Sequence, residues 1–291
     1  MDMPAALSSG HHTVFVGGLK QSYFVAGRGP VCVVHAGGPG ATWNYLRMPL
    51  LEDQLTMIYL EPVGTGASDR LAEHPMGYSV ERYSEQLRGF LVALGLRDVH
   101  LLGHSHGGFV VQHCALSDPD RIAGLILYDT SAVTGPGFLE QADANVRSFA
   151  ARHRGDERAE AVLKAWEAVP SISDDASYTQ TMRALLPAYF ADPYSPSLPL
   201  AAMQEEMHFT FVVGDRLPFD VRDALADLDL PTLVIVGEAD FICGPYWART
   251  LTTAIPNSDL LFLSECGHLA HVEKAEVFAG AVISFVQRNS R

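Results

Sequence analysis

Short runs rich in apolar residues at consecutive positions recur along the chain, and glycine, proline, polar or acidic residues flank them. Six such runs occupy residues 30–36, 55–62, 98–105, 124–131, 231–240 and 258–268. Because apolar residues fill consecutive positions rather than every second one, the runs predict strands of a parallel sheet that is buried on both faces. Segment 13–24 precedes them and is typical of an antiparallel pair of strands.

Helical spacing fills the intervals between the predicted strands. It covers residues 79–96, 107–119, 245–256 and 274–289. Strands that alternate with helices indicate βαβ units. The expected fold class is therefore α/β, with a mostly parallel, doubly wound sheet and helices on both of its faces.

The alternation is interrupted once, between residues 132 and 225. This segment contains no strand-like run, while 137–153 and 157–169 have helical spacing. Insertions of this length in compact domains are usually lids or binding elements. We expect residues 1–131 and 226–291 to form the core, and residues 132–225 to form an inserted helical cap subdomain.

Charge narrows the class of partner. The chain has 291 residues, a formal net charge of −14 and 48% hydrophobic residues, which is typical of a globular protein with a sizeable core. A negative surface repels phosphate backbones and anionic headgroups, so we expect neither nucleic acid nor a membrane surface as a partner. A small molecule or a short peptide is the expected ligand.

The cysteines and apolar runs indicate a compartment. The four cysteines lie in or beside apolar segments without C-x-x-C spacing, which favours buried, reduced thiols in a cytoplasmic protein over a zinc or redox site. No apolar run approaches the roughly 18 residues of a membrane span, and no secretory leader is recognisable. No motif requires a metal or a cofactor.

One stretch carries a nucleophile motif. Residues 103–107, GHSHG, fit G-x-S-x-G and lie between a predicted strand and a predicted helix. A serine on such a tight turn needs neighbours with almost no side chain, and Gly103, Gly107 and Gly108 meet that need. The turn exposes the hydroxyl of Ser105 and directs the backbone N–H of His106 at a developing oxyanion. We interpret Ser105 as the catalytic nucleophile.

A serine hydroxyl needs a base. His104 and His106 flank the turn and point away from the hydroxyl, so we expect them to pack or to line a pocket. His268 follows the last predicted strand, where a loop can hold an imidazole over the carboxyl end of the sheet. His268 is the predicted base, and His271 is the alternative.

The base in turn needs an acid that fixes its tautomer. Asp240 ends the apolar run 231–240 and is the predicted acid. Two alternatives are Glu238 in the same turn and Asp129, which follows the preceding strand. The order Ser105, Asp240, His268 is the nucleophile–acid–base order of this strand–turn–helix architecture.

With these segments in place, the chain resembles the α/β-hydrolases, and within them the prolyl aminopeptidase (proline iminopeptidase) group, which includes the tricorn-interacting aminopeptidases. GGPG at 37–40 matches the H-G-G-P-G motif of that group, 237–245 is similar to its acid-bearing turn, and 266–273 is similar to its histidine loop. The resemblance implies that the N–H of Gly38 is the second oxyanion donor. We also expect Gly37 and Trp43, in the same loop, to contact substrate.

The chain departs from the pattern of the group at two places. Ala36 stands where the group has histidine, with His35 one position earlier. In segment 59–69, Glu61 and Val63 replace the aspartate and arginine of a D-Q-R-G motif. Substrate recognition in this segment is therefore expected to differ from that of the group.

The cap contains a further similarity. Segment 205–211, EEMHFTF, is similar to one in which a glutamate binds the free α-amine of the substrate. The match implies Glu206 as the amine anchor with Glu205 beside it, and the alternative is a solvated pair on a helix. The resemblance implies a serine aminopeptidase or amidase that releases an N-terminal residue of the proline type.

Two other functions remain open. The same triad serves an esterase, lactonase or thioesterase that acts on a small specialised metabolite, and the fold does not choose between these reactions. The second is a ligand-binding receptor built on a hydrolase scaffold.

Overall fold

An eight-stranded sheet forms the centre of the computed structural model, which describes residues 5–214 and 218–290. The strand order is β1-β2-β4-β3-β5-β6-β7-β8. β1 and β2 form an antiparallel hairpin that pairs antiparallel with β4, and the remaining pairs are parallel. The strands are Gly10–Val16, Leu19–Gly27, Val31–His35, Thr56–Leu60, Val99–His104, Ile122–Tyr128, Thr232–Gly237 and Ser258–Leu263, for β1 to β8.

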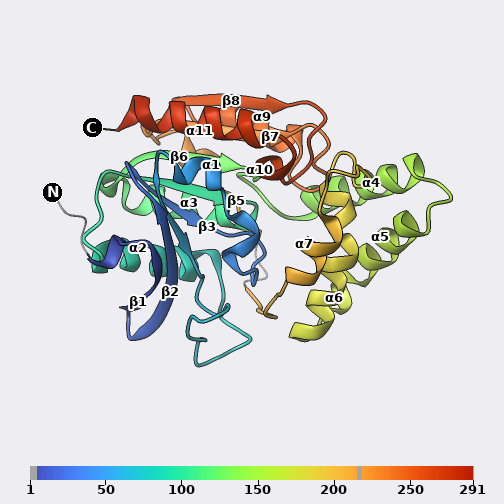
Figure 1. Cartoon of the computed structure of the whole chain (residues 1–291), viewed down its shortest axis with the longest axis horizontal. Coiled ribbons are helices and arrows are strands. Elements are labelled where there is room, and N and C mark those ends of the chain that lie inside the picture. Colours follow the sequence, from blue (N-terminus) through green and yellow to red (C-terminus); the bar gives the residue numbers. More distant parts are fainter. Residues whose placement is uncertain (1–4, 215–217, 291) are drawn as a thin grey trace.

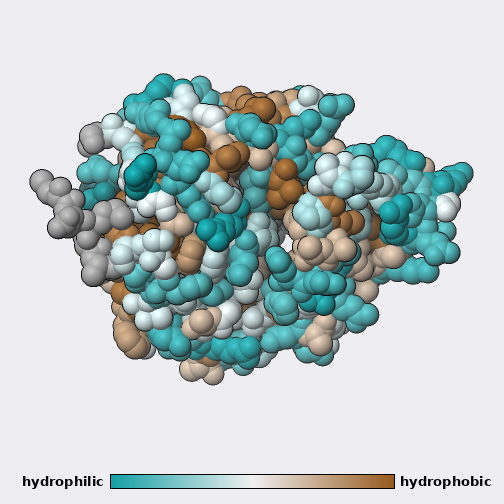
Figure 2. All heavy atoms as spheres, viewed as in Figure 1, coloured by the Kyte–Doolittle hydropathy of each residue, from teal (hydrophilic) through white to brown (hydrophobic). Residues whose placement is uncertain are grey.

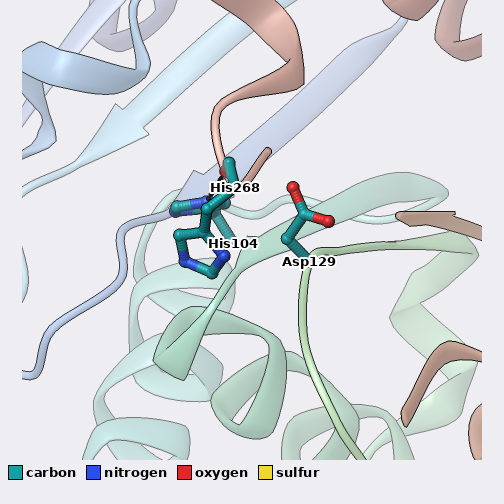
Figure 3. A group of neighbouring side chains, drawn as sticks. All are labelled: His104, Asp129 and His268. Atoms are coloured by element: carbon teal, nitrogen blue, oxygen red, sulfur yellow. Dashed lines mark hydrogen bonds between the residues drawn. The ribbon is translucent and has the colours of Figure 1, made fainter. Parts of the chain in front are cut away.

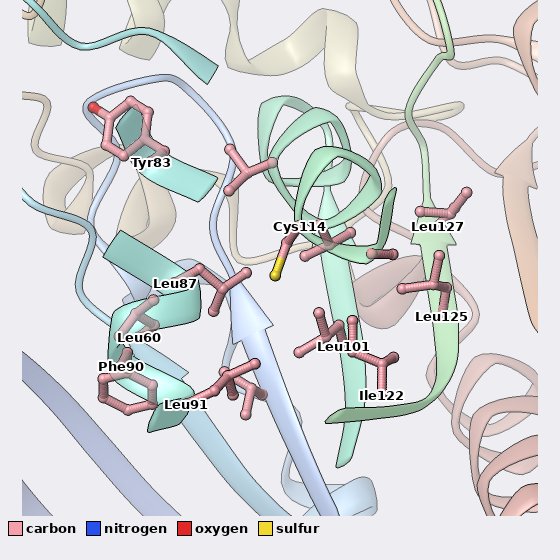
Figure 4. Packing of buried hydrophobic residues seen from close by; sticks show 14 of the residues in the cluster. Leu60, Tyr83, Leu87, Phe90, Leu91, Leu101, Cys114, Ile122, Leu125 and Leu127 are labelled. Atoms are coloured by element: carbon pink, nitrogen blue, oxygen red, sulfur yellow. The ribbon is translucent and has the colours of Figure 1, made fainter. Parts of the chain in front are cut away.

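Helices cover both faces of this sheet (Figure 1). α2 (Val80–Ala93), α3 (His106–Ser117) and α9 (Pro245–Ala254) pack on one face, where they form an apolar cluster with Leu101 of β5 (Figure 4). α1 (Pro49–Glu52) and α11 (Ala275–Asn289) pack on the other face against Leu102. Successive residues of one strand thus enter opposite cores, which is why the strands are apolar at consecutive positions. The predicted fold class is confirmed.

The last strand differs from the others. Every residue of β4, β5 and β7 is buried. β8 is an edge strand, and its Leu260 and Phe262 are 42% and 41% exposed. The prediction of burial on both faces is therefore wrong for β8, because an apolar run does not show that a strand has a neighbour on each side.

The segment between β6 and β7 is helical. It contains α4 (Pro136–Arg152), α5 (Glu157–Ala168), α6 (Asp175–Leu185), α7 (Leu200–Glu206) and α8 (Arg222–Leu225). Helices α4 to α7 project from one side of the sheet layer (Figure 1), and residues of α4, α5 and α6 share a separate apolar cluster. Apolar atoms gather where these helices meet the rest of the molecule (Figure 2). Among the helices of the described residues, none has the length and apolarity that crossing a bilayer requires.

Candidate active site

Ser105 occupies the strained turn that the motif predicts. It has φ 54° and ψ −122°, lies between β5 and α3, and donates its N–H to Tyr128 at the end of β6 (3.0 Å). A Cβ on Gly107 would collide with the carbonyl oxygen of His35, and one on Gly103 would lie 2.5 Å from the carbonyl oxygen of Gly107. Small neighbours are therefore needed for close packing here, while the surrounding sheet maintains the unusual serine backbone.

His268 and Asp240 form a buried pair. Nδ1 of His268 lies 2.7 Å from Oδ2 of Asp240, and the two residues are 2% and 3% exposed. The other carboxylate oxygen, Oδ1, accepts the N–H groups of Ile242 (2.9 Å) and Cys243 (3.0 Å). The N–H of His268 donates to the carbonyl of Tyr189 (2.7 Å). These contacts fix the imidazole with its proton on Nδ1, which leaves Nε2 as the basic nitrogen.

The nucleophile and the base meet at one cavity. Ser105 and His268 both line it, and the side chain of Ser105 lies against the thiol of Cys243. Among the described residues, no hydrogen bond joins the Ser105 hydroxyl to His268. Catalytic hydrogen bonds of this kind often form only when substrate is bound.

The flanking histidines have different surroundings. Nδ1 of His104 accepts the hydroxyl proton of Tyr45 (2.8 Å), and Nε2 donates to the carbonyl of His268 (3.0 Å). Burial lowers the pKa of His104 well below its ordinary range, which keeps the ring neutral, as this pattern requires. The ring of His106 packs against Tyr83 and Phe109. His104 lines the cavity and His106 packs, so neither is placed as the base.

The alternatives to the predicted base and acid also have clear positions. Both ring nitrogens of His271 are engaged, by the hydroxyl of Tyr128 (2.8 Å) and the carbonyl of Tyr45 (2.7 Å). Glu238 is exposed and accepts the N–H of Glu265 (3.3 Å). These residues therefore lie outside the buried pair. Asp129, by contrast, lies directly beside it.

Two backbone N–H groups are free to bind an oxyanion. The hydrogen bonds of the described residues include none donated by the N–H of Gly38 or of His106. The N–H of Gly37 is occupied, because it donates to the hydroxyl of Tyr45 (2.8 Å). Gly38 has φ 114°, a conformation that favours glycine. Both N–H groups of the predicted donor pair are therefore without a protein partner among the described residues.

His104, Asp129 and His268 lie together (Figure 3) and could bring three ligand atoms within 4.8 Å of one another. However, both nitrogens of His104 and Nδ1 of His268 are already hydrogen-bonded. Only Nε2 of His268 and a carboxyl oxygen of Asp129 are left for a cation, whereas a catalytic zinc ion takes three protein ligands. The group fits a hydrogen-bond network better than a metal site.

The cavity has a volume of about 300 Å³ and lies between the ends of the strands and the helices of the 132–225 segment. Its outer wall is mostly apolar and includes Met182, Leu186, Met203, Met207, Phe209 and Ile242. Among the described lining residues, Glu206 is the only Asp, Glu, Lys or Arg. Glu206 ends α7 and is exposed, so the cavity carries one negative charge at its solvent-accessible side.

Side chains of α6 fasten this outer wall. The guanidinium of Arg183 donates three hydrogen bonds, two to the carbonyl of Met207 (3.2 and 3.0 Å) and one to that of Glu205 (2.9 Å). The hydroxyl of Tyr178 donates to the carbonyl of Pro39 in the glycine loop (2.8 Å). The end of α7 is therefore held to α6, and α6 is held to the candidate oxyanion loop.

Trp43 does not reach the cavity, so we do not retain the prediction that it contacts substrate. Its ring is buried in a stack, 5.0 Å from the ring of Phe24 and 5.3 Å from that of Tyr59. Tyr45, which the sequence analysis missed, lines the cavity instead. Both residues lie in a 3-10 turn, Trp43–Leu46. The signal in the sequence that could have identified Tyr45 is that it is a second aromatic residue, two positions after Trp43.

Other predicted contacts divide in the same way. Gly37 lines the cavity, and a Cβ on it would lie 3.0 Å from the Cβ of Ser105. Glu205 is exposed and is not among the lining residues. Glu61 and Val63 are buried and likewise do not line the cavity, so their difference from the related group does not act by direct contact there.

Comparisons with known proteins agree with this architecture. The family model described as the alpha/beta hydrolase fold matches residues 29–275. A proline iminopeptidase of Lactobacillus acidophilus is 24% identical over 298 residues, which covers 94% of this chain and 96% of that protein. A 2-hydroxy-6-oxononadienedioate/2-hydroxy-6-oxononatrienedioate hydrolase of Cupriavidus pinatubonensis is 27% identical over 269 residues, covering 90% and 88%.

A solved structure of a proline iminopeptidase from Mycobacterium smegmatis superposes with a TM-score of 0.70 at 23% identity, over 96% of this chain and 98% of that one. The chain belongs to the α/β-hydrolase family. Within that family it is similar to proline iminopeptidases and also to a hydrolase of a different substrate class.

Proposed function

We propose that this protein is a serine hydrolase that cleaves amides of substrates with a free α-amine, as a prolyl-type aminopeptidase does. The observation that carries the proposal is the carboxylate of Glu206, the one carboxylate among the described residues that line the cavity with Ser105 and His268. The similarity to proline iminopeptidases supports the same class of substrate.

The proposed reaction begins at the turn after β5. The Ser105 hydroxyl turns from Cys243 toward Nε2 of His268, which accepts its proton as the oxygen attacks the carbonyl carbon. The N–H groups of Gly38 and His106 stabilise the oxyanion that forms. The carboxylate of Asp240 accepts a hydrogen bond from Nδ1–H and stabilises the imidazolium. His268 then protonates the leaving amine, and water repeats the sequence on the acyl-enzyme.

Recognition of the substrate is assigned to the outer wall. An ammonium group that enters an apolar cavity needs an anion, because an unpaired buried charge is costly. Glu206 provides this anion at the rim, and the apolar wall accommodates the rest of the substrate. An N-acylated substrate has no ammonium group, so it would lose this interaction. The cavity thus selects for a free amino terminus.

The test compares two neighbouring glutamates. Hydrolysis of proline and alanine arylamides is measured with and without N-acetylation, beside a short-chain aryl ester, for wild type and Ser105→Ala. Glu206→Gln is expected to raise KM for the free-amine arylamides by about 10- to 100-fold, the effect of losing one charge-assisted hydrogen bond. Glu205→Gln is the matched control, because Glu205 is exposed and does not line the cavity.

Each outcome decides one part of the proposal. Turnover of free-amine arylamides alone, lost in Ser105→Ala and weakened in Glu206→Gln, supports the aminopeptidase. Turnover of the ester without any arylamide would overturn it in favour of an esterase or lactonase. Equal effects of the two glutamine variants would remove Glu206 as the amine anchor.

A further inference from the structure

A second carboxyl group lies beside the catalytic pair. Asp129 follows β6, is 0% exposed and has φ 45°, a left-handed conformation that is uncommon outside glycine. Its Oδ1 accepts the N–H of Gly237 at the end of β7 (2.9 Å). Oδ2 receives no hydrogen bond from a donor of the described residues. A carboxylate oxygen of Asp129 lies within 4.8 Å of a ring nitrogen of His268, and the side chain is near enough to the Asp240 carboxyl to interact with it.

The lone pairs of Asp240 are almost fully used. Oδ1 of Asp240 accepts two N–H groups, and Oδ2 faces Nδ1 of His268. What Asp240 has left toward Asp129 is acceptor capacity only. Two ionised carboxylates in contact, both buried, repel one another strongly, and a shared proton removes the repulsion.

No cation is placed to neutralise a second charge. No ion pair of the described residues includes Asp129. The groups that face it are Asp240 beyond β7, His268 beyond β8, His104 at the end of β5 and Glu273 in α10 (Ala270–Glu273). The remaining neighbours, Tyr128, Cys243 and Cys266, have pKa values that burial raises, so they are neutral.

We propose that Asp129 is a positioning residue of the triad, with a protonated Oδ2 that donates a hydrogen bond to Asp240 and holds the carboxylate toward His268. The proposal rests on the triad assigned under the proposed function. It gives the strained turn after β6 a purpose, because the left-handed backbone of Asp129 lets one side chain join Gly237 and Asp240. Burial and the neighbouring charge of Asp240 also raise the pKa of Asp129 well above its ordinary range.

The experiment uses a readout that does not depend on the natural substrate. The rate at which a fluorophosphonate labels Ser105 is measured from pH 5 to 9 in wild type, Asp129→Asn, Asp129→Ala and Asp240→Asn. An asparagine keeps an acceptor for Gly237 and a donor for Asp240, so Asp129→Asn is expected to label within about threefold of wild type. Asp240→Asn is expected to lose about 10⁴-fold, because its amide favours the wrong imidazole tautomer.

The pH profile separates positioning from simple packing. Asp129→Ala removes the donor and leaves more negative charge on the Asp240 carboxylate, which favours the protonated, inactive form of the imidazole beside it. The acid limb of the labelling profile should move to higher pH by roughly one unit, while Asp129→Asn leaves it in place. An unchanged limb in a folded Asp129→Ala variant would overturn the proposal.

A stability measurement keeps the inference testable if Asp129→Ala does not fold. A carboxyl whose pKa is higher in the folded state binds more protons there, so the wild type loses stability as pH rises above about 3.9, the ordinary value of an aspartate, toward the folded value. Asp129→Asn has no carboxyl at this position and does not lose stability in this way, so its Tm should rise relative to that of wild type between pH 4 and pH 7. If the Tm of Asp129→Asn instead falls relative to that of wild type as pH rises, Asp129 is ionised in the folded protein.

These outcomes are distinct from failure of the proposed function. If wild-type Ser105 is not labelled, the serine-hydrolase assignment fails. If wild type is labelled and Asp129→Asn falls as far as Asp240→Asn, only the role of Asp129 as a neutral donor fails, and Asp129 would be the ionised acid.

Discussion

The two sides of the cavity are built by different means. On the sheet side, Ser105, Asp240 and His268 each follow a strand of the central sheet, and hydrogen bonds to neighbouring backbone groups hold each residue in place. On the opposite side, α7 and the segment after it are only partly buried, and a few side chains such as Arg183 hold them. The groups proposed to act in catalysis thus lie on a rigid support, whereas the groups proposed to bind the substrate lie on a less constrained wall.

This difference predicts how substitutions divide between kcat and KM. Changes on the sheet side displace groups that act in the transition state, so they should lower kcat with little change in KM. Changes in the outer wall alter binding of the substrate in its ground state, so they should mainly raise KM.

The largest effect is expected for the base. His268→Ala should lower kcat/KM by about 10⁴-fold or more, because no other imidazole of the described residues is paired with Asp240. His271→Ala is the matched comparison and should keep kcat/KM within about threefold while it lowers Tm, because its two hydrogen bonds are structural. Steady-state kinetics and thermal melts measure both. Similar losses of activity in the two variants would contradict the assignment of His268.

The next effect concerns acid stability of the sheet side. Burial lowers the pKa of His100, a residue of β5, to about 4, and its ring nitrogens have no partner among the described residues. Such a group binds fewer protons folded than unfolded, so stability is lost as pH falls from about 6.5 toward 4, by roughly 3 kcal/mol.

His100→Leu should therefore flatten the decline of Tm between pH 6.5 and pH 4.5. Replacement of the exposed His11 by glutamine is the control and should leave the decline as it is. Thermal melts at half-unit intervals of pH provide the measurement. A decline that is equally steep in His100→Leu would show that other groups govern acid unfolding.

A smaller effect tests the hydrogen-bond chain between the two sides. The Tyr45 hydroxyl joins the N–H of Gly37 to Nδ1 of His104, so Tyr45→Phe leaves two polar groups without a partner. We expect kcat to fall by about tenfold. Trp43→Phe, in the stack beneath, should lower Tm and leave kcat unchanged. The reverse pattern would restore Trp43 as the substrate contact.

These residues also show where sequence alone succeeds. Ser105, Asp240 and His268 could be predicted, because a parallel strand fixes the direction in which the next residues emerge and the three strands end at one edge of the sheet. The geometry found for them matches the predicted arrangement, although their catalytic roles remain proposals. The positions of these residues depend on local chain geometry, which a motif and the strand before it define together.

Other positions depend on contacts that the sequence does not reveal. Trp43 and Tyr45 differ by two positions in a 3-10 turn, and the sequence gives no phase for that turn. The presence of Asp129 beside Asp240 depends on its left-handed backbone, which no pattern of apolar residues indicates. The exposure of β8 follows from its place at the sheet edge, a property of topology rather than of composition.

The smallest effect belongs to the outer wall. Arg183 binds the carbonyls of Glu205 and Met207, on either side of Glu206, so it holds the end of α7 without touching the nucleophile. Arg183→Leu should raise KM for free-amine arylamides by up to about tenfold, since Glu206 loses its fixed position while kcat stays the same. KM for an aryl ester without an amine should not change.

Arg147→Leu is a suitable control for this variant, because Arg147 forms an exposed ion pair with Asp143 on α4 (2.9 Å) and does not contact the cavity wall. Such pairs contribute little to stability. If Arg183→Leu lowered kcat for amide and ester alike, the outer wall would position the catalytic groups as well as the substrate. Through the bond from Tyr178 on the same helix to Pro39, α6 offers a direct route for that coupling. A change confined to KM would instead show that this bond does not transmit the disturbance, and the two sides of the cavity would act independently.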